Sequence, residues 1–145
     1  MKNFIKTMDT LVETLQALDL VIQHEQTLLC SGRVNGMALQ TITEQKSSLL
    51  TTVDYLDGQR RQHDVRLKQT APYSRQPEIA DRWKSIVTLT QKLSNINRHN
   101  GLLLDKQLTY NTQALSILKA SQTNKFYGPN GQAMQPKQLA RKISV

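Results

Sequence analysis

The sequence predicts an all-α protein, an elongated antiparallel three-helix bundle of the coiled-coil type with a flexible C-terminal tail. Three long stretches have apolar residues recurring at threes and fours, which is typical of amphipathic helices. Short connections near 31–35 and 69–77 separate them, so neighbouring helices should pack antiparallel. With 38% apolar and 5% aromatic residues, thin helices are favoured over a thick globular core. We therefore expect a helical domain at 1–120 and a basic tail at 121–145.

The first predicted helix, residues 3–30, has the most regular apolar pattern of the chain. Its apolar residues cover a stripe of about 80° at about 100° per residue, which is the narrow seam of a coiled coil. The seam residues are Phe4, Met8, Leu11, Leu15, Leu18, Ile22 and Leu29. Glu25 fills the gap in this seam, and Gly32 is expected to end the helix as its C-terminal capping residue.

The second predicted helix begins near Gly36, with Asn35 as its N-cap, and continues to about Lys68. Lys46 interrupts its apolar face. Lys46 and Glu25 either set the register between helices or lie at a wet edge of the bundle. The predicted buried face consists of Met37, Leu39, Ile42, Leu49, Leu50, Val53 and Leu56.

The third predicted helix, residues 78–120, contains no proline, and Pro77 suits its first position. At 1.5 Å per residue this helix would be about 65 Å long, so roughly its last ten residues should extend beyond the second helix. From Leu102 onward its apolar residues spread over about two-thirds of the circumference, more than one neighbouring helix can cover. Apolar residues without a partner in their own chain indicate a binding site for another molecule.

The pair Asn100-Gly101 falls inside this third helical stretch. Propensity alone favours a break there, whereas the periodic residues on both sides favour a continuous helix with a weak point. The glycine is explained equally well by a hinge and by the close approach of another backbone.

Residues able to support catalysis or metal binding do not form a recognisable constellation. The histidines His24, His63 and His99 lie on different helices, without an acid or cysteine at a metal-ligand spacing. Cys30 is the only cysteine, so no intrachain disulfide forms and a reducing compartment is expected. We expect no catalytic residue, no metal site and no cofactor.

Targeting signals are also missing from the sequence. Asp9 and Glu13 lie where the apolar region of a signal peptide would be. No uncharged run approaches the length of about 18 residues that spans a bilayer. The expected location is the cytoplasm.

The net charge of +8 is concentrated at the C-terminus, since residues 121–145 hold four basic residues and no acid. This favours, as an alternative function, a nucleic-acid-binding regulator that uses the tail and a second basic cluster. The second cluster is Arg60, Arg61, Arg66, Lys68 and Arg75. Its first four members point in several directions on a helix, so a solvated helix end is preferred. A purely structural coiled-coil oligomer is the third alternative.

Five collinear stretches resemble the flagellar synthesis protein FlgN family. They are ITEQKSSLLTTVDYLDGQRR from Ile42, IADRW from Ile79, LSNINRHNGLLL from Leu93, YGPNGQ from Tyr127 and KISV at the C-terminus. The likeness covers nearly the whole chain, and 68–77 and 121–126 are its least similar parts. No single motif is as specific as a metal signature, so the resemblance depends on their order along the chain.

The resemblance implies a helical export chaperone without catalytic activity or a small-molecule substrate. Family members bind the terminal segments of hook–filament junction proteins (flagellar hook-associated proteins), prevent their premature association and deliver them to the cytoplasmic domain of the type III export gate. The export ATPase complex is a further candidate partner. The family's client-binding region maps here to Leu103, Leu104, Leu108, Leu115, Ile117 and Leu118. Its gate-docking tyrosine maps to Tyr127, which Gly-Pro-Asn-Gly follows here with an added proline.

Overall fold

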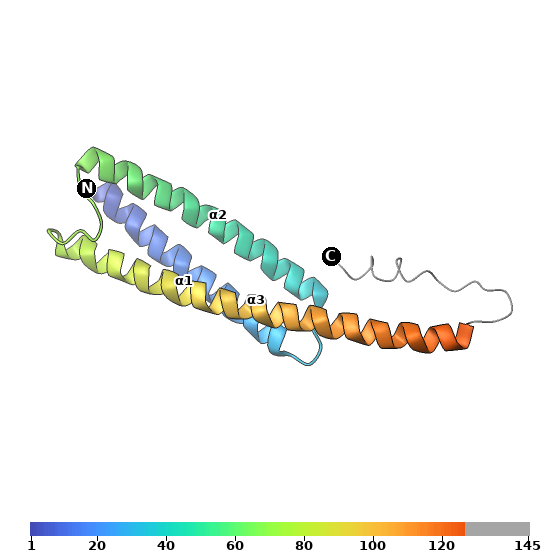
Figure 1. Cartoon of the computed structure of the whole chain (residues 1–145). Helices are drawn as coiled ribbons and strands as arrows, with labels where there is room; N and C mark the ends of the chain where they lie inside the picture. The colour runs from blue at the N-terminus through green and yellow to red at the C-terminus, as the bar shows by residue number, and fades with distance from the viewer. Residues whose placement is uncertain (127–145) are drawn as a thin grey trace. The chain divides into compact units, whose positions relative to one another are not determined.

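The computed structural model describes residues 1–126, and the side chains of residues 1–121. It contains three helices, α1 (Lys2–Cys30), α2 (Gly36–Leu67) and α3 (Pro77–Phe126), shown in Figure 1. Residues 1–126 include no β-strand, so the predicted all-α fold is confirmed. The chain divides into two compact units, Met1–Gly101 and a second that begins at Leu102.

The ends of the helices follow local capping signals. The side-chain oxygen of Asn35 accepts hydrogen bonds from the backbone N–H groups of Met37 and Ala38, at 3.1 and 3.2 Å, which confirms the predicted N-cap. α1 ends differently from its prediction. Ser31 is extended, and its hydroxyl donates to the carbonyl of Leu28 at 2.6 Å, while Gly32 does not adopt a left-handed conformation.

The prediction that the third helix ends near Ala120 was wrong, because α3 continues to Phe126. Residues 121–126 contain neither proline nor glycine, and both helix breakers, Gly128 and Pro129, come later. The polar composition of this segment therefore does not end a helix that already exists. The predicted tail begins after residue 126 at the earliest.

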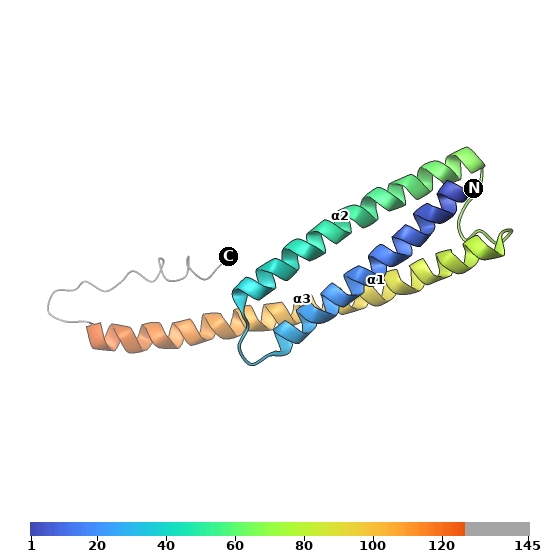
Figure 2. The same cartoon turned by 180° about the vertical axis from the view of Figure 1, so that it is seen from behind.

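In the first unit, α1 and α3 run parallel to each other, and α2 runs antiparallel to both. Two ion pairs, Asp9–Arg82 and Asp19–Lys92, link α1 to α3, and both partners are 73 positions apart (82 − 9 and 92 − 19). A constant offset is the signature of a parallel pair in register. Figures 1 and 2 show α1 on one side of α2 and α3, and α1 has more buried residues than α2.

The core of the first unit forms along the seam predicted for α1. All seven seam residues are buried, and six of them share one core cluster with residues of α2, α3 and the α2–α3 loop. The partners in this cluster are Leu56, Tyr73, Ile79, Ile86 and Leu93. The α1 prediction is therefore confirmed residue by residue.

The buried face predicted for α2 was partly wrong. Only Ile42 and Leu56 are buried, whereas Met37 and Leu50 are exposed. Met37 lies in the first turn of α2, beside the connection that follows the end of α1 at Cys30. Leu50 follows the half-buried Leu49 by one residue and so lies about 100° around the helix.

Candidate functional site

The main apolar surface of the second unit is carried by the part of α3 from Leu102 to Ser121, here called the exposed α3 segment. Four of the six predicted site residues are exposed, namely Leu104, Leu108, Ile117 and Leu118, with Ile117 at 71% and Leu118 at 60%. The other two, Leu103 and Leu115, are half-buried. Apolar side chains this exposed in a regular helix indicate a binding surface.

Helical geometry sorts these residues onto two faces of α3. At about 100° per residue, one face within about 80° carries Leu104, Leu108, Leu115 and Leu118. A second face, about 100° away, carries Leu103, Tyr110 and Ile117 at intervals of seven residues. Tyr110 is 69% exposed and was not predicted as a site residue, although its heptad spacing was visible in the sequence. The segment therefore offers apolar contacts in two directions.

A polar layer joins all three helices near the end of the first unit. The Nζ atom of Lys46 in α2 lies 3.2 and 3.3 Å from the two carboxylate oxygens of Glu25 in α1. The side-chain amide of Asn100 in α3 donates to Glu25 Oε1 at 2.9 Å and to the carbonyl of Ile22 at 3.0 Å. Glu25 is 7% exposed and Asn100 only 2%. These residues lie inside the bundle, so the alternative of a wet edge was wrong.

The glycine beside this layer has no close neighbour. A Cβ atom at Gly101 would meet nothing within 4 Å, so the close approach of another backbone was the wrong explanation for this glycine. α3 passes through Asn100 and Gly101 without a break. The buried hydrogen bonds of Asn100 offset the poor helix propensity of the pair.

The predicted basic cluster is largely neutralised within its own helix end. Arg60 pairs with Asp57 at 2.7 Å and with Asp64 at 3.1 Å, and its guanidinium lies 4.6 Å from the Trp83 ring centroid. Burial lowers the pKa of Arg60, but hydrogen bonds to Asp57 and Tyr73 outweigh burial, so the pKa is raised overall. Arg61 pairs with the same Asp57. These pairs weaken the case for a nucleic-acid surface, which needs free cations along one face.

Tyr73 connects this cluster to the aromatic core. Its ring packs edge-to-face on Phe4 and on Trp83, with 5.7 Å between centroids in each pair. Its hydroxyl accepts a hydrogen bond from Arg60 at 2.9 Å and donates to the carboxylate of Asp64. Burial raises the pKa of Tyr73; the bond from Arg60 opposes this rise, and the bond to Asp64 adds to it. The phenol is therefore held protonated.

Replacing Tyr73 with phenylalanine should lower the free energy of unfolding by about 1–2 kcal/mol at pH 8, because Arg60 and Asp64 each lose a partner. A raised native pKa stabilises the fold fully below the unfolded value of about 10 and is lost as pH rises through the native pKa. The gap between wild type and variant should therefore narrow above about pH 10. Urea denaturation between pH 8 and 11 measures this gap.

Tyr55→Phe is the matched control for that measurement. Tyr55 is exposed and accepts one hydrogen bond from Gln59 within α2. Its substitution should change stability at pH 8 by less than about 0.5 kcal/mol. A gap for Tyr73→Phe that stays constant up to pH 11 would contradict the role given to its hydroxyl.

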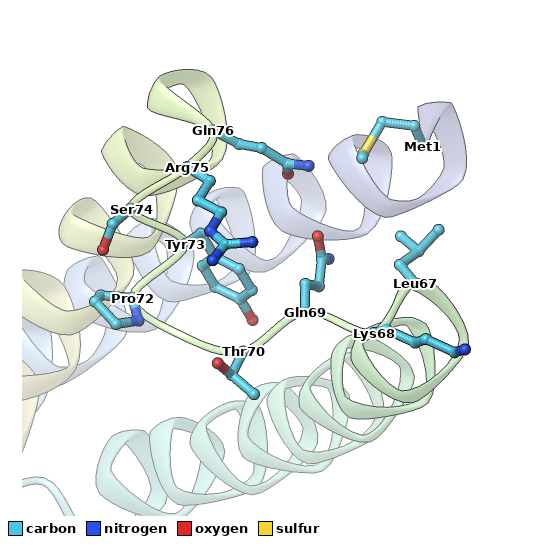
Figure 3. A pocket seen from close by; sticks show the side chains of 10 residues that line it. All are labelled: Met1, Leu67, Lys68, Gln69, Thr70, Pro72, Tyr73, Ser74, Arg75 and Gln76. Carbon is cyan, nitrogen blue, oxygen red and sulfur yellow. The ribbon is translucent and has the colours of Figure 1, made fainter.

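Two hollows occur in the first unit. One, of about 560 Å³, lies at the α2–α3 loop, where Figure 3 shows Gln69, Tyr73 and Arg75 gathered together and Lys68 directed away from Arg75. The other, of about 650 Å³, lies between α2 and α3 and includes Leu11 of α1 in its lining. The second hollow shows that α2 and α3 do not close over α1.

The residues considered for chemistry are dispersed. His24 and His99 are exposed, and His63 packs edge-to-face on Phe4. Cys30 is a free, exposed thiol. In the part of the chain that the structure describes, no group of three metal-ligating side chains occurs, and no helix there is long and apolar enough to cross a membrane. Tyr127 lies outside the described residues.

Together, these features define an all-α helical-bundle protein that presents an amphipathic helical segment. The FlgN protein family model matches residues 1–135, and the chain belongs to the FlgN family. Curated relatives include the "Flagella synthesis protein FlgN" of Yersinia enterocolitica, 44% identical over 95% of this chain and 94% of the relative. Proteins of the same name from Salmonella typhimurium and Escherichia coli are 42% and 41% identical over the full length of both chains. No solved structure matches.

Proposed function

We propose that this protein acts in flagellar assembly as a cytoplasmic, non-enzymatic export chaperone. It binds terminal amphipathic segments of hook–filament junction proteins, prevents their premature association and delivers them to the type III export gate. Membership of the FlgN family and the names of the curated relatives support the role in flagellar synthesis. The observation that carries the chaperone mechanism is the exposed α3 segment with its two apolar faces.

The dimensions of this segment suit a helical client. Leu104 and Leu118 are 14 residues apart, which is about 21 Å along a helix axis. An amphipathic client helix can place anchors at intervals of three and four residues along such a face. Burial of each leucine contributes about 1.5–3 kcal/mol when the side chain becomes fully covered. The second face lets a second client helix, or a second turn of the same client, pack beside the first.

Leu115→Ser combined with Leu118→Ser should weaken client binding at least about tenfold, because two apolar anchors are lost from one face. Neither residue belongs to the core cluster of the first unit, so the melting temperature of the variant should change little. Isothermal titration with the terminal segment of a junction protein measures the affinity, and circular dichroism measures the melting temperature.

Leu20→Ser is the matched control for the client measurement, since Leu20 is 70% exposed on α1 but lies in the first unit. This control should bind the client like wild type. A sharp fall in melting temperature for the α3 variant would show that those leucines stabilise the fold instead of serving a client.

Tyr127→Ala should weaken binding to the cytoplasmic domain of the export gate and leave client affinity unchanged. A tyrosine provides apolar area and one hydrogen bond with few rotamers to restrict, which suits a weak and reversible contact. Raising the salt concentration should weaken docking modestly, because Lys125 and the later basic residues add attraction. Titration of wild type and variant against both partners tests this, with exposed Tyr55→Ala as the control. Equal losses for both partners, or no loss for the gate, would contradict separate contacts.

A further inference from the structure

The three helices of the first unit share a heptad register. Asn100 bonds Glu25, 75 positions earlier (100 − 25). The same offset relates Ile79 to Phe4, Ile86 to Leu11 and Leu93 to Leu18, and all six of these residues belong to the core cluster. The seam of α1 and α3 is therefore apolar at three successive heptad positions and polar at the fourth.

α2 continues this register in the antiparallel direction. Lys46 bonds Glu25, and the positions of the pair sum to 71. Positions with the same sum are Val53 with Leu18 and Leu67 with Phe4, and both α2 residues pack against the core cluster. The fourth position is therefore polar in all three helices, as Glu25, Lys46 and Asn100.

The polar layer is not the arrangement that maximises stability. Asn100 Oδ1 is buried without a hydrogen-bond partner, although the amide nitrogen of the same side chain makes two hydrogen bonds. Replacing a buried ionic group with packed apolar residues is often neutral or stabilising. Single polar residues at heptad seam positions instead select one register, since every other register buries them without partners.

Apolar periodicity alone leaves α3 a choice of register. The heptad series Ile79, Ile86 and Leu93 precedes Asn100, and the exposed α3 segment supplies further apolar residues after it. If α3 slipped by seven residues, Asn100 would face Leu18 in an apolar layer. Glu25 would then lose its amide partner. The wild-type sequence penalises this slip through Asn100 and Glu25 together.

We propose that Glu25, Lys46 and Asn100 form a register-setting layer that keeps the exposed α3 segment out of the three-helix core. Asn100 is the positioning residue, because its amide is specific to one neighbour on α1. The fixed register leaves residues from Leu102 onward available to bind another protein. Only this last step rests on the proposed chaperone function.

Disulfide trapping reads the register directly. In a Cys30→Ser background, Asp19→Cys with Lys92→Cys replaces an ion pair whose side chains lie 3.1 Å apart. Asp19→Cys with His99→Cys reports a slip of seven residues, since position 99 lies about 10.5 Å further along the axis. Under mild oxidation the wild-type layer should form the first bond and not the second.

Changing Glu25, Lys46 and Asn100 together to leucine should increase the 19–99 bond at least about tenfold without lowering the melting temperature. Asn100→Leu alone, which keeps the Glu25–Lys46 pair, should also increase the 19–99 bond. This single variant carries the test if the triple variant does not fold. Formation of the 19–92 bond alone in both variants would overturn the proposal.

The matched control removes polar contacts between the same two helices outside the layer. Asp9→Ala with Arg82→Ala deletes an exposed ion pair between α1 and α3. It should leave the 19–92 bond dominant, and a slip in this control would overturn the assignment of register to the buried layer.

A client titration separates this proposal from the chaperone function. The triple variant should lose client affinity about in proportion to its slipped fraction. If the register changes as expected but wild type binds no client, the layer retains its role and the chaperone function fails. If the register changes and affinity is unaffected, the link between register and client binding is overturned.

Discussion

Phe4→Ala should lower the free energy of unfolding by about 4 kcal/mol, the largest effect expected from a single substitution in this chain. Phe4 is fully buried, and its ring packs edge-to-face on both His63 and Tyr73. Truncation removes the apolar contacts and leaves a cavity that three elements cannot close together, because Tyr73 is also fixed by Arg60 and Asp64. Urea denaturation followed by circular dichroism measures the loss.

Val65→Ala provides the control for this experiment, since Val65 lies in the same end of α2 as His63 but is 82% exposed. Its effect should stay below about 0.5 kcal/mol. A loss of less than about 2 kcal/mol for Phe4→Ala would show that the aromatic cluster repacks and is not a fixed part of the core.

Lys46→Met should lower the free energy of unfolding by about 3 kcal/mol, the second largest effect expected. The carboxylate of Glu25 would then remain inside the bundle with the Asn100 amide as its only remaining side-chain partner among those described here. The side chains of Glu25 and Lys46 are 9% and 18% exposed, so water compensates little for the lost cation. Denaturation at pH 7 measures the change.

Two comparisons isolate the buried charge as the cause. Lys92→Met removes the cation of an ion pair in which the lysine is 51% exposed, and should cost less than about 1 kcal/mol. Adding Glu25→Gln to Lys46→Met removes the unpaired carboxylate and should recover most of the stability. If the double variant is as unstable as Lys46→Met, packing of the lysine stem matters more than charge.

The fold could be predicted where local signals agree with tertiary packing. The α1 seam has a strict pattern of threes and fours, and the Asn35 cap acts within three residues along the chain. Both signals are local, so they could be recognised in the sequence. The end of α3 was predicted too early, because residues 121–126 are polar without being helix breakers.

The candidate site could be predicted only in part, for a physical reason. Exposed leucines after Leu102 follow from periodicity and from the unequal lengths of the helices. The contact between Asn100 and Glu25 joins residues 75 positions apart, and no local pattern pairs them. Tyr73 was likewise missed, because a loop residue gains its role only from partners on three different helices.

The lone thiol of Cys30 has a practical consequence. It is the only cysteine in the sequence, it is exposed, and it lies five residues after Glu25 on the same helix. A maleimide fluorophore would therefore attach to the native chain at one defined position, without any substitution. Its emission would report structural change near the end of α1 in real time, during titration or stopped-flow mixing.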